Sequence, residues 1–160
     1  MPSPTPLTPD TCDICRAHRG DGRRATQLVG VGGGFWVYHA PPDESGLASL
    51  GYLYIESDRH VAYLGDLTDD EAAALGRLRT RLAAALRFSV DPEFVFAAVI
   101  GRGIAHFHEH VFCRHRGTPP DVAWDASDEA APRADPARVA ELVSDLRERL
   151  ADVIRLPTET

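Results

Sequence analysis

The stretch IAHFHEHVFCRH, from Ile104 to His115, holds four of the seven histidines of the chain. Three of them, His106, His108 and His110, follow one another at every second position. Because successive side chains of a β-strand point to opposite faces, a strand places all three imidazoles on one face, about 6.5–7 Å apart. A helix would distribute them around its circumference. The spacing therefore predicts a strand that carries a site.

The chemistry of imidazole leaves two functional interpretations of this strand open. Histidine is the commonest metal ligand, and near neutral pH it also acts as a nucleophile or as a general acid and base. A single strand can hold both kinds of residue. The competing interpretation is a set of polar side chains on a solvent-exposed face of the sheet. Three histidines in register beside an apolar stretch argue against it.

The segments around the histidine strand predict an α+β fold. Two short strands are expected on either side of the glycine bend at Gly32–Gly34, and a buried strand at about Leu50 to Ser57. The segment EFVFAAVIG predicts a further strand, which pairs with the histidine strand across the short GRGI connection. Strands come in runs, with one helix between them and one at the end, which favours an antiparallel sheet.

Capping residues predict where the two helices begin. Thr68 and Glu71 form a capping box at the start of the central helix, and Asp135 with Pro136 marks the start of the C-terminal one. Each helix is expected to bury one apolar face. The faces consist of Leu75, Leu78, Leu82 and Leu86 in the first helix, and of Val139, Leu142, Leu146, Leu150 and Val153 in the second.

Composition places the chain among ordinary globular proteins. It has 160 residues, of which 44% are hydrophobic and 26% charged, enough for a single domain with one core. The formal net charge of −7 argues against a nucleic-acid partner. No apolar run approaches the roughly 18–20 residues of a membrane helix, and MPSPTPLTPDT does not read as a secretory signal. A cytoplasmic location is the expectation.

The pair Cys12 and Cys15 is a second candidate site. Without an export signal, a Cys-x-x-Cys pair indicates metal binding or redox activity sooner than a structural disulfide. Two thiolates do not complete a tetrahedral zinc site, which needs four ligands. The chain offers further histidines as ligands, namely His18, His39, His60, His106 and His115. A redox pair and two unpaired thiols remain the alternatives.

These motifs together resemble the histidine-triad (HIT) family. HFHEHVF is similar to its His-φ-His-φ-His-φ-φ signature, where φ is an apolar residue. GYLYIESDRHVAYLGDLTDDEAAAL resembles the family segment that runs from a strand through a histidine and LT-x-x-E into the central helix, and the Cys-x-x-Cys resembles that of the bacterial zinc-carrying branch. The resemblance spans residues 12–117. It implies a HIT-like sheet of about five antiparallel strands, with one central and one C-terminal helix.

The prolines at the start and the extent of the resemblance together predict a division of the chain. Residues 1–10, with four prolines, form a flexible N-terminal lead, and residues 11–118 form the HIT-like domain. Residues 119–160 supply an irregular segment and a C-terminal helix that packs on the same domain. By family resemblance the chain is a homodimer.

The family implies a role for each matching residue. His108 matches the position of the family's nucleophile, and His110 matches the position of the histidine that contacts the phosphate. The chain would then hydrolyse a nucleotide conjugate, a phosphoramidate or a dinucleoside polyphosphate, at the α-phosphate through a nucleotidyl-histidine intermediate. Four residues match the ligands of the structural zinc ion in the zinc-carrying branch: Cys12, Cys15, His60 and His106.

Three departures from the family pattern bear on function. Glu109 stands where an apolar residue is usual, so it needs cover from a helix or a dimer partner and an ionic partner such as an arginine, unless the strand is less covered. Ser57-Asp58 replaces Pro-Lys. Before the triad, Arg102 is the one obvious polar group; it takes over the phosphate contact or pairs with a surface acid. A nucleotidyltransferase and a catalytically silent nucleotide sensor therefore remain alternatives.

Overall fold

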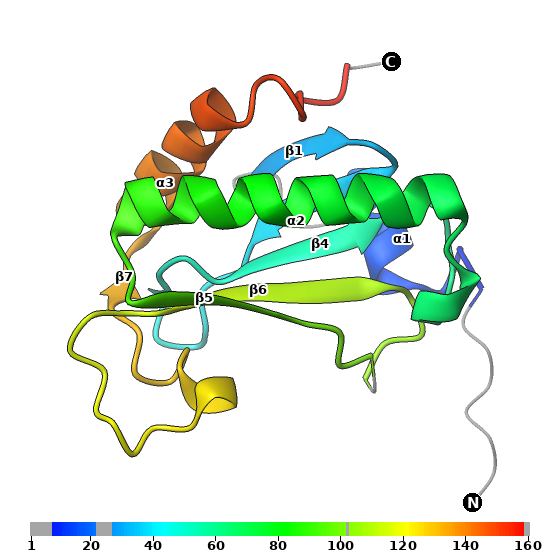
Figure 1. The fold of residues 1–160 in the computed structure, drawn as a ribbon. Coiled ribbons are helices and arrows are strands. Elements are labelled where there is room, and N and C mark those ends of the chain that lie inside the picture. The colour runs from blue at the N-terminus through cyan, green and yellow to red at the C-terminus, as the bar shows by residue number, and fades with distance from the viewer. Residues whose placement is uncertain (1–7, 22–26, 102, 159–160) are drawn as a thin grey trace, which may run out of the picture.

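The computed structural model describes residues 8–21, 27–101 and 103–158. Five strands form one antiparallel sheet, as predicted, and their order in it is β1-β2-β4-β6-β5 (Figure 1). The strands are β1 (Leu28–Gly32), β2 (Phe35–His39), β4 (Leu53–Ser57), β5 (Phe94–Ala98) and β6 (His108–Arg114). The histidine strand β6 lies between β4 and β5, so both of its edges are hydrogen-bonded.

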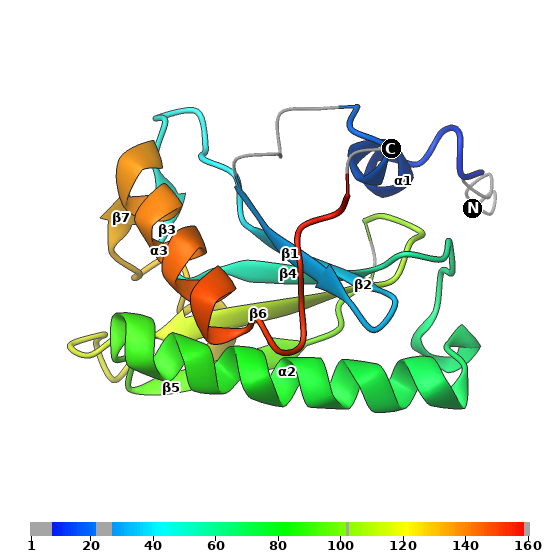
Figure 2. The ribbon, with the colours of Figure 1, turned by 90° about the horizontal axis from the view of Figure 1, so that it is seen from above.

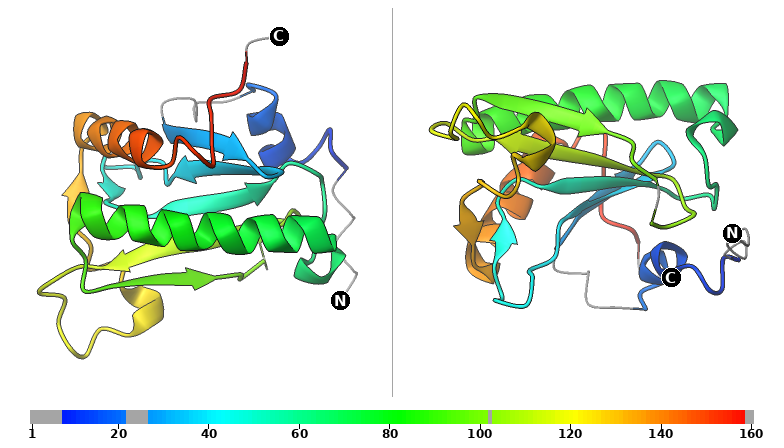
Figure 3. Two further views of the ribbon diagram at one scale, coloured as in Figure 1. Left: turned by 45° about the horizontal axis from the view of Figure 1, so that its top comes forward. Right: turned by 90° about the horizontal axis from the view of Figure 1, so that it is seen from below.

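Helices cover both faces of the sheet. The helices α2 (Asp69–Val90) and α3 (Pro136–Arg149) pack their apolar side chains on one face, and the short helix α1 (Asp13–His18) lies across the opposite face (Figure 2). The view from below shows α1 and α2 on opposite sides of the strands (Figure 3).

Alternation along the strands divides the residues between the two faces. Side chains of the core face are fully buried beneath α2 and α3 and include Phe35, Val37, Leu53, Ile55 and Val111. On the opposite face the register aligns Trp36 with Glu56 and Glu56 with His108. The next row aligns Tyr54 with His110. The functional face of the sheet is therefore the one that α1 covers.

The predicted helix caps are present. The Thr68 hydroxyl accepts a hydrogen bond from the Glu71 amide, and the Glu71 carboxylate accepts one from the Thr68 amide. Asp135 caps α3 by accepting from the Arg138 amide at 2.8 Å. Such a cap stabilises a helix by about 1 kcal/mol. The predicted leucine face of α2 is buried throughout.

The histidine strand is shorter than predicted. β6 begins at His108, so His106 lies on a bend before the strand. The pairing with β4 nevertheless extends one residue further, because the Ser57 amide donates to the Phe107 carbonyl at 3.1 Å. The bend places the ring of the first triad histidine beside Cys12 and Cys15 at α1.

The segment after β6 is more ordered than the sequence suggested. It contains a short 3₁₀ helix, η3 (Trp124–Ala126), and a two-residue strand, β7 (Arg133–Ala134), which pairs with β3 (Ala48–Ser49). A second 3₁₀ helix, η2 (Leu64–Asp66), precedes α2. In the described part of the chain, no helix has the length and apolar character needed to cross a membrane.

His115 and Arg114 donate hydrogen bonds to backbone carbonyls before and after β6. His115 is 7% exposed and its Nε2 donates to the Leu50 carbonyl at 2.8 Å. Arg114 donates to the carbonyls of Val122 and Pro119 at 2.9 and 2.8 Å. Both side chains thereby satisfy backbone carbonyls of the connections around β6.

Candidate metal centre and active site

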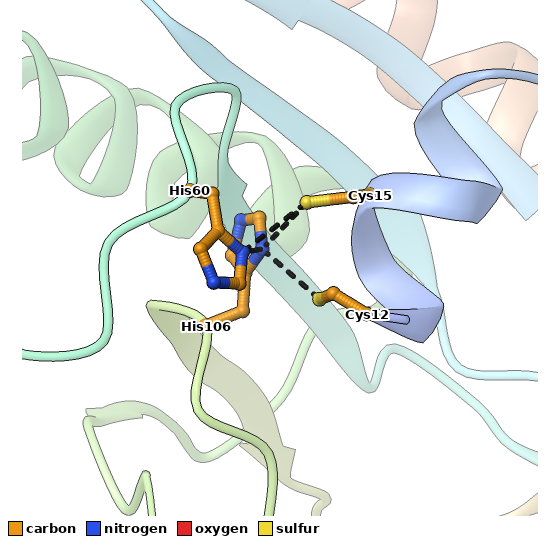
Figure 4. Close-up of side chains that lie close together, drawn as sticks. All are labelled: Cys12, Cys15, His60 and His106. Carbon is orange, nitrogen blue, oxygen red and sulfur yellow. Dashed lines mark hydrogen bonds between the residues drawn. The ribbon is translucent and has the colours of Figure 1, made fainter. Parts of the chain in front are cut away.

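Four side chains converge below α1 to form a compact group of metal-ligating atoms. The Sγ atoms of Cys12 and Cys15 and ring nitrogens of His60 and His106 all lie within 4.8 Å of one another (Figure 4). His106 Nδ1 is 3.4 Å from each sulfur and 3.2 Å from His60 Nδ1. Three of the four residues are buried.

Local structure brings these residues together from three parts of the chain. The helix α1 carries Cys15, with Cys12 as its N-cap residue, and places both thiols on its sheet-facing side. His60 lies between β4 and η2, and the bend before β6 supplies His106. The Phe107 amide donates to the Val61 carbonyl, and this bond ties the two histidine segments to each other.

The donor set and its spacing fit a tetrahedral zinc ion. With Zn–S near 2.3 Å and Zn–N near 2.0 Å, neighbouring ligand atoms lie roughly 3.3–3.8 Å apart. Four of the six separations are 3.2–3.4 Å, close to that range, and the other two are within 4.8 Å. His106 Nε2 donates to the Ser57 carbonyl at 2.7 Å, which leaves Nδ1 unprotonated and aimed at the sulfurs.

Electrostatics at the cluster also favour a cation. Burial, together with the adjacent Cys12, raises the pKa of the Cys15 thiol to about 11. Burial lowers the pKa of His106, so this imidazole is neutral. A metal ion would offset the cost of the buried thiolates, and its binding would release protons.

The second and third triad histidines lie side by side on the functional face. The ring centroids of His108 and His110 are 5.2 Å apart. His108 Nδ1 donates to the carbonyl of His106 at 2.7 Å. Since a carbonyl only accepts, the proton stays on Nδ1 and the lone pair on Nε2. An imidazole that attacks through Nε2 must carry its proton on Nδ1, as His108 does here.

His110 is held in a cage of aromatic rings. Its Nδ1 is 2.8 Å from the hydroxyl of Tyr52, and the ring of Tyr54 meets it edge-on at 5.2 Å. Burial, with the nearby His108, lowers the pKa of His110 to about 4. His110 is therefore neutral at physiological pH and offers one N–H donor.

A buried pair of His18 and Glu56 connects α1 to the functional face. His18 Nε2 lies 3.0 Å from Glu56 Oε2, and both side chains are less than a tenth exposed. The imidazole also stacks on Trp36, with ring centroids 4.6 Å apart. The end of α1 is thus fixed above the strands, next to the row that contains His108.

A cavity of about 400 Å³ lies between α1 and the sheet. Its floor is formed by Tyr54, Glu56 and His108. Its walls combine apolar and charged side chains: Ile14, Ala17, Pro41 and Ile104, with Asp13, Arg16 and Asp21. A volume of this order accommodates a small organic ligand, with His108 at its surface.

Comparison with solved structures identifies the architecture. A zinc-bound histidine triad family protein from Mycobacterium smegmatis matches with a TM-score of 0.66 at 20% identity, over 91% of this chain and 96% of that chain. A hypothetical histidine triad nucleotide-binding protein from Sulfolobus tokodaii matches with a TM-score of 0.66 at 17% identity, over 88% and 93%. The chain has the histidine-triad fold. No family model and no curated protein matches it.

A more distant match shares the histidine-triad fold. The diadenosine triphosphate hydrolase of Plasmodium falciparum, solved with cyclomarin A, matches with a TM-score of 0.59 at 9% identity, over 81% of this chain and 80% of that chain. At these identities the matches establish the fold alone.

Within the histidine-triad fold, the structure groups most of the residues that the sequence singled out. The four expected zinc ligands form one cluster, and His108 with His110 forms the adjacent face. Arg102 lies outside the described residues. Tyr52 and Glu56 carry no motif that would single them out, although both lie at strand spacing from Tyr54, before His60.

Proposed function

We propose that the chain hydrolyses nucleotide conjugates at the α-phosphate, with His108 as the nucleophile. The observation that carries the proposal is the hydrogen bond from His108 Nδ1 to the His106 carbonyl at 2.7 Å. It fixes the tautomer whose Nε2 lone pair is free to attack. His108 lines the cavity below α1, so a substrate can reach the ring.

The reaction proceeds in two displacements at phosphorus. In the first, the Nε2 lone pair of His108 forms a P–N bond; the bond to the leaving group breaks, and that group takes the electron pair and a proton from solvent. In the second, water attacks phosphorus, the P–N electron pair returns to Nε2, and a proton passes to solvent. A nucleoside monophosphate is released. His110 donates to a non-bridging oxygen as negative charge develops.

A structural zinc ion belongs to this proposal. Cys12, Cys15, His60 and His106 would hold it, and its charge would stabilise the two buried thiolates. The bound ion would fasten α1 over the cavity.

The test is nucleotide release from adenosine and guanosine phosphoramidates and from dinucleoside polyphosphates. We expect turnover by the full chain and none by His108→Gly with an unchanged zinc content and melting temperature. Added imidazole should restore part of the activity, because it can occupy the vacated space and attack phosphorus itself. Turnover that survives His108→Gly would refute the assignment of the nucleophile. Transfer of the nucleotidyl group to an added phosphate acceptor in place of water would indicate a transferase.

A second candidate is a nucleotide-binding protein without turnover. The buried carboxylate of Glu56, which is His108's cross-strand neighbour, favours it, because negative charge beside the nucleophile disfavours approach of an anionic phosphate. Binding of a nucleoside monophosphate with no release from any conjugate would support this second function.

A further inference from the structure

Tyr52 is the residue through which the third triad histidine is held. Its hydroxyl oxygen lies 2.8 Å from His110 Nδ1. The Tyr52 ring stacks on Phe112, with centroids 5.4 Å apart and planes 15° from parallel, and meets His110 edge-on at 5.9 Å. The phenol is thereby fixed against one edge of the His110 imidazole.

The backbone on both sides of Tyr52 is fixed as well. Its carbonyl accepts from the Ala40 amide at 2.8 Å. The preceding Gly51 has φ +79°, a conformation that L side chains rarely adopt, and a Cβ there would lie 3.2 Å from Cys113 Sγ. The Gly51 amide donates to the buried His39 Nε2 at 3.1 Å. The conformation of the turn before Tyr52 is therefore fixed, and with it the position of the Tyr52 backbone.

The chemistry of the pair determines which atom donates. Burial raises the pKa of Tyr52, so the phenol keeps its proton, and His110 is neutral at physiological pH. A phenol is a good donor, and the unprotonated nitrogen of imidazole is a good acceptor. The hydrogen bond then runs from the hydroxyl to Nδ1. A neutral imidazole that accepts at Nδ1 carries its proton on Nε2, at the opposite edge of the ring.

We propose that Tyr52 is a positioning residue: its hydroxyl holds His110 in the tautomer and orientation that present Nε2–H to a phosphoryl oxygen. Tyr52 itself does not touch the substrate. The catalytic consequence rests on the proposed function, whereas the tautomer of His110 does not. Without the hydroxyl, the ring is free to flip and to exchange its proton between the two nitrogens.

The first test is the tautomer itself, read from long-range ¹H–¹⁵N correlation spectra of the zinc-loaded, ¹⁵N-histidine-labelled protein. The signals of His110 are assigned from the spectrum of His110→Gln. We expect an unprotonated Nδ1 and a protonated Nε2 in the wild type. In Tyr52→Phe, which keeps the stacking ring, the two nitrogen shifts should move toward each other as the tautomers mix.

The second test is kinetic. Tyr52→Phe should lower kcat by roughly tenfold with little change in KM, a smaller loss than deletion of a whole transition-state donor causes. Tyr63→Phe, at a tyrosine that is 74% exposed, is the matched control and should leave both constants unchanged.

A wild-type His110 protonated on Nδ1 overturns the proposal, and so does a tautomer that Tyr52→Phe leaves unaltered. The wild-type spectrum decides even if the variant folds poorly. If the wild type turns over no conjugate, the proposed function fails, and the spectra still decide the role of Tyr52.

Discussion

At the scale of single residues, the buried carboxylate of Glu109 depends on one ionic partner. Its side chain faces the core side of β6 and is about 1% exposed. Arg79 of α2 meets it with two hydrogen bonds, of 2.5 and 2.8 Å. The pair raises the pKa of Arg79. Of the possibilities for Glu109, cover by a helix and an arginine partner is confirmed.

Removal of that arginine should destabilise the fold. Arg79→Met leaves a buried carboxylate without its ionic partner, so we expect the free energy of unfolding to fall by about 2–4 kcal/mol. The half-exposed position of Arg79 places the loss below that of a fully buried pair. Urea denaturation at pH 7 measures it.

Two further variants isolate the ionic interaction. Arg81→Met, on the same helix, removes an exposed pair with Asp152 and should cost less than about 1 kcal/mol. The double variant Arg79→Met/Glu109→Leu should recover most of the lost stability, because no buried charge remains. If Arg79→Met and Arg81→Met are equally stable, the buried pair contributes nothing beyond a surface contact.

At the scale of secondary structure, α1 is an element that its own sequence does not explain. Its six residues make less than two turns, and no side chain caps its start. Isolated helices of that length are unstable in water. Its stability therefore comes from what it contacts: the cysteine–histidine cluster at one end and the His18–Glu56 pair at the other.

We therefore expect α1 to be folded when zinc is bound and to unfold locally when zinc is lost. Purified protein is expected to hold about one zinc per chain, and Cys12→Ser should lose it. Amide hydrogens of α1 should then exchange faster, while those of α2 keep their protection. Cys113→Ser is the matched control, since Cys113 is equally buried but lies in the apolar core, away from the cluster. Metal-free wild type with a reversible Cys12–Cys15 disulfide would instead support a redox pair.

Some helices and sites could be predicted from local sequence patterns, and others depend on contacts between distant segments. The central helix could be predicted because its cap and its leucine period are local signals, written within one segment. The cluster of Cys12, Cys15, His60 and His106 could be expected only through family resemblance. The roles of Glu56 in β4 and of Tyr52 just before it depend on how β4 pairs with β6, and that register is set by pairing between distant segments. Likewise, α1 depends on contacts that no local pattern contains.

At the scale of the whole molecule, the outer edge of β5 is the surface best suited to a second copy of the chain. In the described residues β5 pairs on one side only, with β6. Phe94 of β5 and Phe88 of α2 are 59% and 77% exposed, and both line a groove of about 640 Å³. Exposed aromatic side chains beside an unpaired edge are typical of an interface.

A homodimer through this edge is the expected state in solution. Phe94→Glu should shift the dimer to monomer, because it places a charge in the apolar contact; light scattering after gel filtration measures the mass. Leu64→Glu, at a residue of η2 that is 54% exposed, should leave the dimer intact. A wild type that is monomeric at micromolar concentration would contradict the expectation.

The opposite edge of the sheet, formed by β1, is not free to pair with a further copy of the chain at Val31. On β1, Val31 exchanges two backbone hydrogen bonds with Arg155 of the C-terminal segment, at 2.8 and 3.0 Å. Of the two edges of the five-stranded sheet, the described residues pair the β1 edge at Val31 and leave the β5 edge open. When two identical edges join about a two-fold axis, none remains to recruit a third molecule, whereas two open edges per molecule would propagate a fibre. If the expected dimer forms through β5, the pairing of Val31 with Arg155 would keep the β1 edge from joining a third molecule, and the assembly would stay a closed pair.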